Sequence, residues 1–155
     1  MQSIHNKWLS EIIWWVLTGI LAMLILYPIY YFKIDYPFYK NNIIFIFGFF
    51  IFLRWVLLWH LTPYARYQWL KLIIIFTNIP LIFYLSYEFS DFKNYIDEVG
   101  LQDLVEKLKD TEQFAMSRYI RSEMIFFSIC CLITGFLVPP KLIWNIWKQY
   151  NLDKV

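Results

Sequence analysis

The sequence predicts an all-α fold: an integral membrane four-helix bundle with a short-helix extramembrane insert between the third and fourth spans. Composition is the first reason, since 60% of the 155 residues are hydrophobic and only 17% are charged. In soluble domains about 45–50% of residues are apolar and about 25% are charged. This chain therefore has too few polar residues to cover the surface of a fold in water. The second reason is that the apolar residues gather in long blocks. The third is a single acidic segment that separates the last two blocks. The length indicates one membrane domain, residues 1–155.

The first apolar block, residues 12–32, contains enough residues to cross one hydrocarbon core of about 30 Å. It is too long for the apolar part of a signal peptide, and no small-residue cleavage site follows it, so we expect a retained span. Pro28 should bend its last turns, and Pro139-Pro140 should stop or kink the fourth helix. A short polar turn joins the second and third blocks, which predicts an antiparallel hairpin. The expected spans are about 12–32, 42–61, 69–87 and 122–147.

The segment of about 88–121 is the expected extramembrane insert. Nine of the twelve acids lie between Glu88 and Glu123, together with five bases. Its apolar residues nevertheless keep the i, i+3, i+4, i+7 spacing of amphipathic helices. That stripe consists of Phe92, Tyr95, Ile96, Val99, Leu101, Leu104, Val105 and Leu108.

Polar residues at the ends of this stripe predict how the insert is divided. Gly100 falls where the stripe changes phase, so we expect one helix to end there and a second short helix to follow. Ser90 and Asp91 are suitable N-caps for the first helix. Asp110 and Gln113 have the spacing of a capping box, which predicts a third helix that enters the membrane.

The insert is also the predicted docking surface for a partner. Burial of the stripe through Leu104 and Leu108 must offset the entropy of ordering the segment, and two helices suggest that a second surface helps to cover it. The acids Asp97, Glu98 and Asp103 would then face a basic partner and repel anionic headgroups. The acids lack the alternate spacing and glycine bend of a calcium loop, and their spacing is that of solvated helix faces.

Four residues in the apolar blocks are candidates for a functional site. Arg54 lies near mid-depth of the second span, where an arginine costs about 2.5–3.5 kcal/mol even on a lenient scale. It indicates either a substrate, proton or headgroup pathway, or a structural arginine that snorkels or bonds to carbonyls or Asn78. No acid occupies the middle of a span, so we expect no intramembrane ion pair and place Arg54 near Asn78. His60 fits either a proton relay or an ordinary interfacial hydrogen bond. Asn78 and Pro80 fit either a kinked helix that lines a cavity or a packed structural kink.

Nothing in the sequence indicates a catalytic residue, a metal ligand set or a cofactor. Cys130 and Cys131 are adjacent rather than spaced as a C-x-x-C redox pair, and we interpret them as small packing residues. His5 and His60 are too few and too far apart to bind a metal. A net charge of +2 without a basic cluster does not indicate nucleic acid binding.

Lysines and arginines in short loops predict the orientation of the spans. Placing both termini in the cytoplasm puts six bases on that side and leaves the acidic insert on the other. Those bases are Lys7, Arg66, Lys71, Lys141, Lys148 and Lys154.

Three stretches carry a resemblance to known sequences: Ile79–Tyr84, Asp97–Leu101 and Arg118–Met124. They resemble uncharacterised four-span inner-membrane proteins of Bacteroidota, and the likeness covers most of the chain. None of these stretches has a known chemical role. The resemblance therefore implies a bacterial inner membrane and no particular activity.

Three classes of function fit the sequence. The first, which we favour, is a non-catalytic subunit or assembly factor of a membrane complex that docks a membrane protein partner through the insert. The second is a small transporter or channel built around Arg54, Asn78 and His60. The third is a lipid-directed membrane enzyme, for which the sequence offers no nucleophile and base. Stable partners would favour the first class and a homo-oligomer the second.

Overall fold

A computed structural model describes residues 4–152 of the chain. The described residues form helices joined by short loops, without a strand, and four of these helices are long and apolar enough to cross a membrane. This confirms the all-α prediction and fits a multi-pass membrane protein. The elements are α1 (Ile4–Tyr31), α2 (Tyr39–Leu58), the 3-10 turns η1 (Trp59–Leu61) and η2 (Pro63–Arg66), α3 (Gln68–Glu98), α4 (Gln102–Val105) and α5 (Asp110–Leu152).

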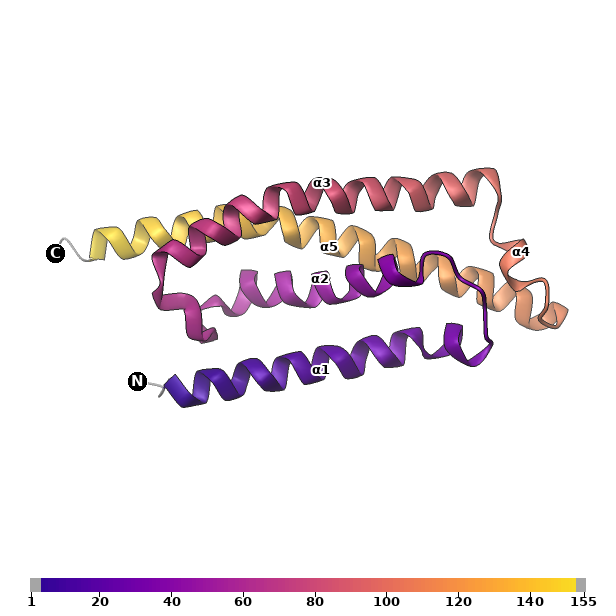
Figure 1. Cartoon of the computed structure of the whole chain (residues 1–155), viewed down its shortest axis with the longest axis horizontal. Helices are drawn as coiled ribbons and strands as arrows, with labels where there is room; N and C mark the ends of the chain where they lie inside the picture. The colour runs from indigo at the N-terminus through magenta and orange to yellow at the C-terminus, as the bar shows by residue number, and fades with distance from the viewer. Residues whose placement is uncertain (1–3, 153–155) are drawn as a thin grey trace.

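The long helices run antiparallel in sequence order, and α5 extends along the whole bundle (Figure 1). Helices α2 and α3 pack against α5, whereas α1 lies on the outside and contacts its neighbours more sparsely. The first residues of α1 and the last residues of α5 lie at the same end of the bundle, which we call the terminal end. The opposite end, where α4 lies, is the distal end. Lys154 falls outside the described residues.

The contact between α2 and α5 depends on residues without bulk. A β-carbon at Gly48 would lie 2.7 Å from the Cys131 sulfur, and one at Gly135 would lie 3.1 Å from the Phe52 ring. Both distances are shorter than ordinary van der Waals contact, so the two helices approach each other through these glycines. Cys131 is fully buried in this contact, and both cysteines are free thiols.

The helices extend beyond the expected spans. Helix α1 begins at Ile4 rather than near residue 12, and α3 continues to Glu98 rather than ending near residue 87. Ser90 and Asp91 therefore lie inside α3, and the prediction that they cap a separate helix is wrong. The physical reason is packing, because Phe92 is fully buried against the rings of Tyr36 and Phe38.

The segment 88–121, the distal hairpin, thus consists of the end of α3, the single turn α4 and the first turns of α5. Gly100 ends α3 as predicted, with a left-handed φ of 82° and its N–H bonded to the Tyr95 carbonyl. Helix α5 begins at Asp110 as predicted. The capping box is wrong, however, because the Gln113 amide donates to the carbonyls of Glu106 and Leu108.

Proline does not interrupt any of the three helices that contain it. Helix α1 passes Pro28, α3 passes Pro80 and α5 passes both Pro139 and Pro140. Of the two alternatives at Pro139-Pro140, a stop is therefore wrong, whereas the expected span of 122–147 correctly runs past both prolines in one continuous helix. Part of the reason is a hydrogen bond that Asn78 donates to the Gly135 carbonyl of α5.

Candidate functional site

Arg54 forms a buried ion pair with Glu11. The guanidinium Nε and Nη2 donate to Glu11 Oε2 at 3.1 and 3.0 Å, and the arginine is only 3% exposed. Both expectations about its partner are therefore wrong: an ion pair forms, and Asn78 is not involved. Glu11 immediately precedes the apolar block of 12–32, so the search for an acid in the middle of a span did not include it.

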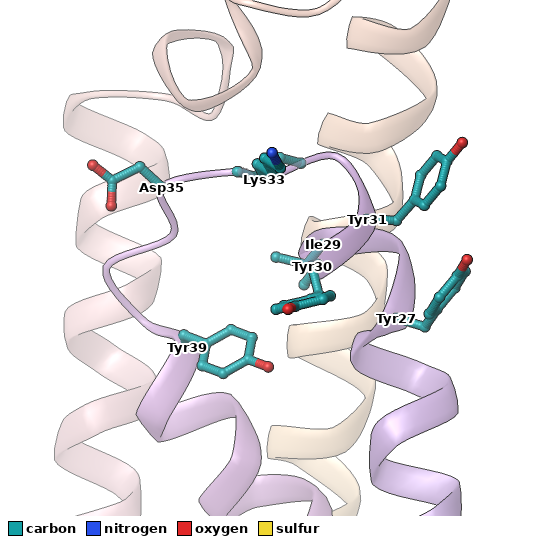
Figure 2. A pocket seen from close by; sticks show the side chains of 8 residues that line it. Tyr27, Ile29, Tyr30, Tyr31, Lys33, Asp35 and Tyr39 are labelled. Carbon is teal, nitrogen blue, oxygen red and sulfur yellow. The ribbon is translucent and has the colours of Figure 1, made fainter.

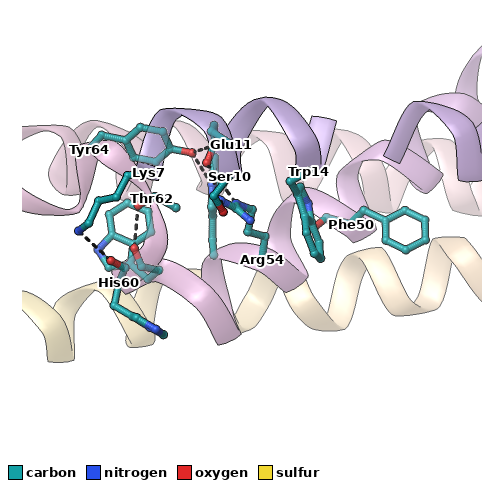
Figure 3. Close-up of polar contacts among 11 residues, drawn as sticks. Lys7, Ser10, Glu11, Trp14, Phe50, Arg54, His60, Thr62 and Tyr64 are labelled. Carbon is teal, nitrogen blue, oxygen red and sulfur yellow. Dashed lines mark hydrogen bonds and ion pairs between the residues drawn. The ribbon is translucent and has the colours of Figure 1, made fainter. Parts of the chain in front are cut away.

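The ion pair is the centre of a polar cluster that we call the terminal cluster, made of Ser10, Glu11, Arg54, Trp55 and Tyr64. The Tyr64 hydroxyl donates to Glu11 Oε1 at 2.9 Å and accepts from Trp55 Nε1 at 3.2 Å. Arg54 also donates to Ser10 Oγ at 3.3 Å. Figure 3 shows the side chains of Glu11, Arg54 and Tyr64 converging from α1, α2 and η2. The cluster therefore fastens the otherwise loosely packed α1 to α2 and η2.

The electrostatics of the terminal cluster keep Tyr64 neutral. Burial, reinforced by the Glu11 carboxylate, raises the pKa of Tyr64 to about 12. Trp14 lies on the other side of Arg54, with its ring centroid 5.2 Å from the guanidinium carbon, and its indole donates to the Phe50 carbonyl. Arg54 and Glu11 thus satisfy each other's charge, which is the arrangement expected of a structural ion pair.

His60 does not join the terminal cluster. Its side chain is exposed in η1, the turn after α2, and its backbone carbonyl accepts a hydrogen bond from Lys7 at 3.0 Å (Figure 3). The contact adds a second tie between α1 and the turn after α2.

Asn78 bonds to α5 and supports the helix at its prolines. Its buried amide donates to the Gly135 carbonyl at 2.8 Å. Pro139 has no N–H, so it leaves the carbonyl four residues earlier, that of Gly135, without its helical partner. Asn78 supplies that missing donor. Pro80, two residues further along α3, is exposed. Arg54, His60 and Asn78 therefore contact three different residues and do not form one site.

A second polar cluster lies toward the distal end of α2. The Asn42 amide donates to Glu123 Oε2 at 2.6 Å, and the Asn41 amide donates to Glu88. Asn42 and Glu123 are buried, and burial together with the nearby Glu123 carboxylate raises the pKa of Tyr36. These contacts join α2 to α3 and α5. Sequence analysis missed them because Glu88 and Glu123 were grouped with the acids of the insert.

The predicted docking residues divide into two groups. Asp97, Glu98 and Asp103 are exposed, as a docking surface requires. Leu104 and Leu108 are half-buried and pack against the core. The chain's own core therefore covers much of the stripe, so the stripe does not by itself require the second surface that the sequence suggests, and docking there stays a prediction.

One aromatic side chain of the distal hairpin remains uncovered. Phe114 is 73% exposed and lines two adjoining cavities of about 350 and 430 Å³. Arg118 and Arg121 line the first cavity, and Asp103 and Asp110 line the second. Within residues 4–152, no group of three or more metal-ligating side chains is present.

These findings show two helix-joining polar clusters and an ordered hairpin with one uncovered aromatic residue. Comparison of the chain with protein-family models, curated proteins and solved structures finds no match.

Proposed function

We propose that this chain is a non-catalytic subunit or assembly factor of a protein complex in a bacterial inner membrane, with both termini in the cytoplasm. The distal hairpin would then project from the other side and dock a protein partner. The observation that supports this proposal best is Phe114, an exposed aromatic residue on an ordered, charged hairpin. Aromatic and arginine side chains beside a cavity are typical of the energetically important centre of an interface.

The position of the hairpin supports the same proposal. Helix α5 is 43 residues long, about 65 Å at the helical rise, against about 30 Å for a hydrocarbon core. Phe114 lies nine residues before Glu123, which places it about 13 Å further along α5. If the hydrocarbon core begins near Glu123, at the start of the expected span of 122–147, Phe114 would lie outside it, in headgroups or water, unless a partner covers it.

Charge defines the partner's chemistry. Asp97, Glu98 and Asp103 are exposed on the hairpin, and no ion pair joins them to a base among the described residues. A partner with a basic surface and an apolar residue that meets Phe114 would match both features. The transporter alternative requires Arg54, His60 and Asn78 on one path, and their separate partners give it no support, so we do not pursue it.

The test is purification from native membranes in mild detergent. We expect a stoichiometric protein partner to co-purify with the chain. Phe114→Ala, or lysine at Asp97, Glu98 and Asp103 together, should release it. Trp147→Ala is the matched control, because Trp147 is exposed near the terminal end and lies outside the hairpin. A chain that purifies alone, or one that retains its partner after a Gly/Ser linker replaces residues 100–109, would contradict the proposal.

A further inference from the structure

A groove with one apolar part and one polar part lies between α1 and α2. Near the distal end, a cavity of about 750 Å³ is lined by Tyr27, Tyr30 and Tyr39 and by Lys33 and Asp35 of the connecting loop. Figure 2 shows Tyr30 and Tyr39 facing each other from the two helices, below the loop that carries Lys33 and Asp35. The same three tyrosines line a second cavity of about 410 Å³. The two cavities are therefore one continuous groove.

The second cavity is apolar along its length. Apart from the tyrosines, it is lined by Gly19, Ala22, Met23, Leu26, Ile43 and Phe47. Gly19 contributes open space, because a β-carbon at this position would have no neighbour within 4 Å. Away from the tyrosines, these walls offer water no hydrogen-bond partners, so the occupant of this part of the groove is expected to be apolar. Between two helices that cross a bilayer, that occupant is a hydrocarbon chain.

Lys33 places a positive charge at the polar end of the groove. It is the C′ residue of a Schellman motif, in which Lys33 N–H bonds the Tyr30 carbonyl and Ile34 N–H bonds the Ile29 carbonyl. Its φ of 50° is left-handed, a conformation in which glycine is the ordinary residue. The chain carries a lysine where the backbone favours glycine, which indicates that the side chain itself is needed.

The polar groups at this end are free to bind a ligand. Among the described residues, no hydrogen bond or ion pair engages the Lys33 ammonium or the hydroxyls of Tyr30 and Tyr39. The ammonium and the tyrosine hydroxyls that line this cavity are donors that suit a phosphate group, and the Asp35 carboxylate in the same lining suits the amine of a zwitterionic headgroup.

We propose that this groove binds one glycerophospholipid, with an acyl chain along the Gly19 side and the phosphate at Lys33 and the tyrosines. The two parts of the groove match the two parts of this ligand, and they lie in the order that a lipid in a bilayer presents them. The loose packing of α1 against α2 leaves the space that the acyl chain of the lipid would fill.

The test is native mass spectrometry of the delipidated protein with three probes: dioleoylphosphatidylethanolamine, dioleoylglycerol and inorganic phosphate. We expect one phospholipid per chain, and weaker binding of dioleoylglycerol by about tenfold, because it lacks the charge-assisted contact to the phosphate. Lys33→Gly should weaken phospholipid binding to a similar degree without lowering the melting temperature, since glycine suits the left-handed backbone. Gly19→Leu should block the apolar part of the groove. Lys40→Ala is the matched control, because Lys40 is exposed near the same end and does not line the groove.

Equal binding of dioleoylglycerol and the phospholipid would overturn the proposed phosphate contact. Unchanged lipid binding by Gly19→Leu would show that the acyl chain does not lie in this groove. That result would overturn the proposed site. If Gly19→Leu does not fold, Lys33→Gly decides the matter through its binding and melting temperature together. Binding of inorganic phosphate alone, without lipid, would overturn the proposal in favour of a soluble anion.

Discussion

Arg54 is the residue for which sequence reasoning and structure differ most. An arginine in an apolar segment must find compensation, and the sequence predicts that need correctly. It cannot identify the partner, because Glu11 lies 43 residues away on another helix and precedes the apolar block. Only the pairing of α1 with α2 brings the two charges to the same level. A rule that counts acids only within apolar blocks therefore misses ion pairs at their edges.

The first prediction concerns this ion pair. Arg54→Leu should lower the free energy of unfolding by about 3–5 kcal/mol, because it leaves the Glu11 carboxylate buried without its counter-charge. Replacing both residues with leucine should recover most of that loss, since no charge then remains buried. Unfolding in mixed detergent micelles measures all three variants. A double variant no more stable than Arg54→Leu would show that the ion pair is not what the single change disrupts.

At the scale of the helices, α5 shows why proline is a weak predictor of helix ends in an apolar chain. The sequence predicts a stop or kink at Pro139-Pro140, and the helix continues to Leu152. The carbonyl that Pro139 leaves without a partner is bonded instead by Asn78, from a helix more than fifty residues earlier. The sequence shows that Pro139 removes one helical hydrogen bond. Only the tertiary structure shows that Asn78 replaces it.

The second prediction tests this compensation with a double-mutant cycle. Asn78→Ala should cost about 0.6–1.7 kcal/mol, the range of interhelical hydrogen bonds in membranes. The cost should fall in a Pro139→Ala background, because alanine restores the N–H that reaches the Gly135 carbonyl. Pro28→Ala is the matched control background, since Pro28 lies in α1 and leaves Gly135 untouched. An equal cost of Asn78→Ala in all three backgrounds would contradict the coupling.

The four long helices could be predicted from the apolar blocks, and their ends could not. Helix α3 runs on past Ser90 because Tyr36 and Phe38, from the loop after α1, cover Phe92. A local pattern gives the period of a stripe but not the residues that bury it. For the same reason the exposed acids of the insert were predictable, whereas the burial of Leu104 and Leu108 against the chain's own core was not.

For the whole molecule, orientation is the decisive property, and both termini should face the cytoplasm. The third prediction uses an impermeant thiol reagent on intact cells. Asp103→Cys on the distal hairpin should be labelled from outside, and Lys148→Cys near the terminal end only after permeabilisation. The unsubstituted chain controls for Cys130 and Cys131, which lie within an apolar helix. If only Lys148→Cys were labelled from outside, the predicted orientation would be wrong and both termini would face outward.

The unbroken length of α5 has a mechanical consequence. A rod of about 65 Å that tilts by about 10° carries its far end sideways by about 11 Å. Helices tilt to match their apolar length to the bilayer, so the lateral position of Phe114 changes with bilayer thickness. Because α5 is continuous from Asp110 to Leu152, a tilt imposed near its terminal end would also displace Phe114 at the distal end.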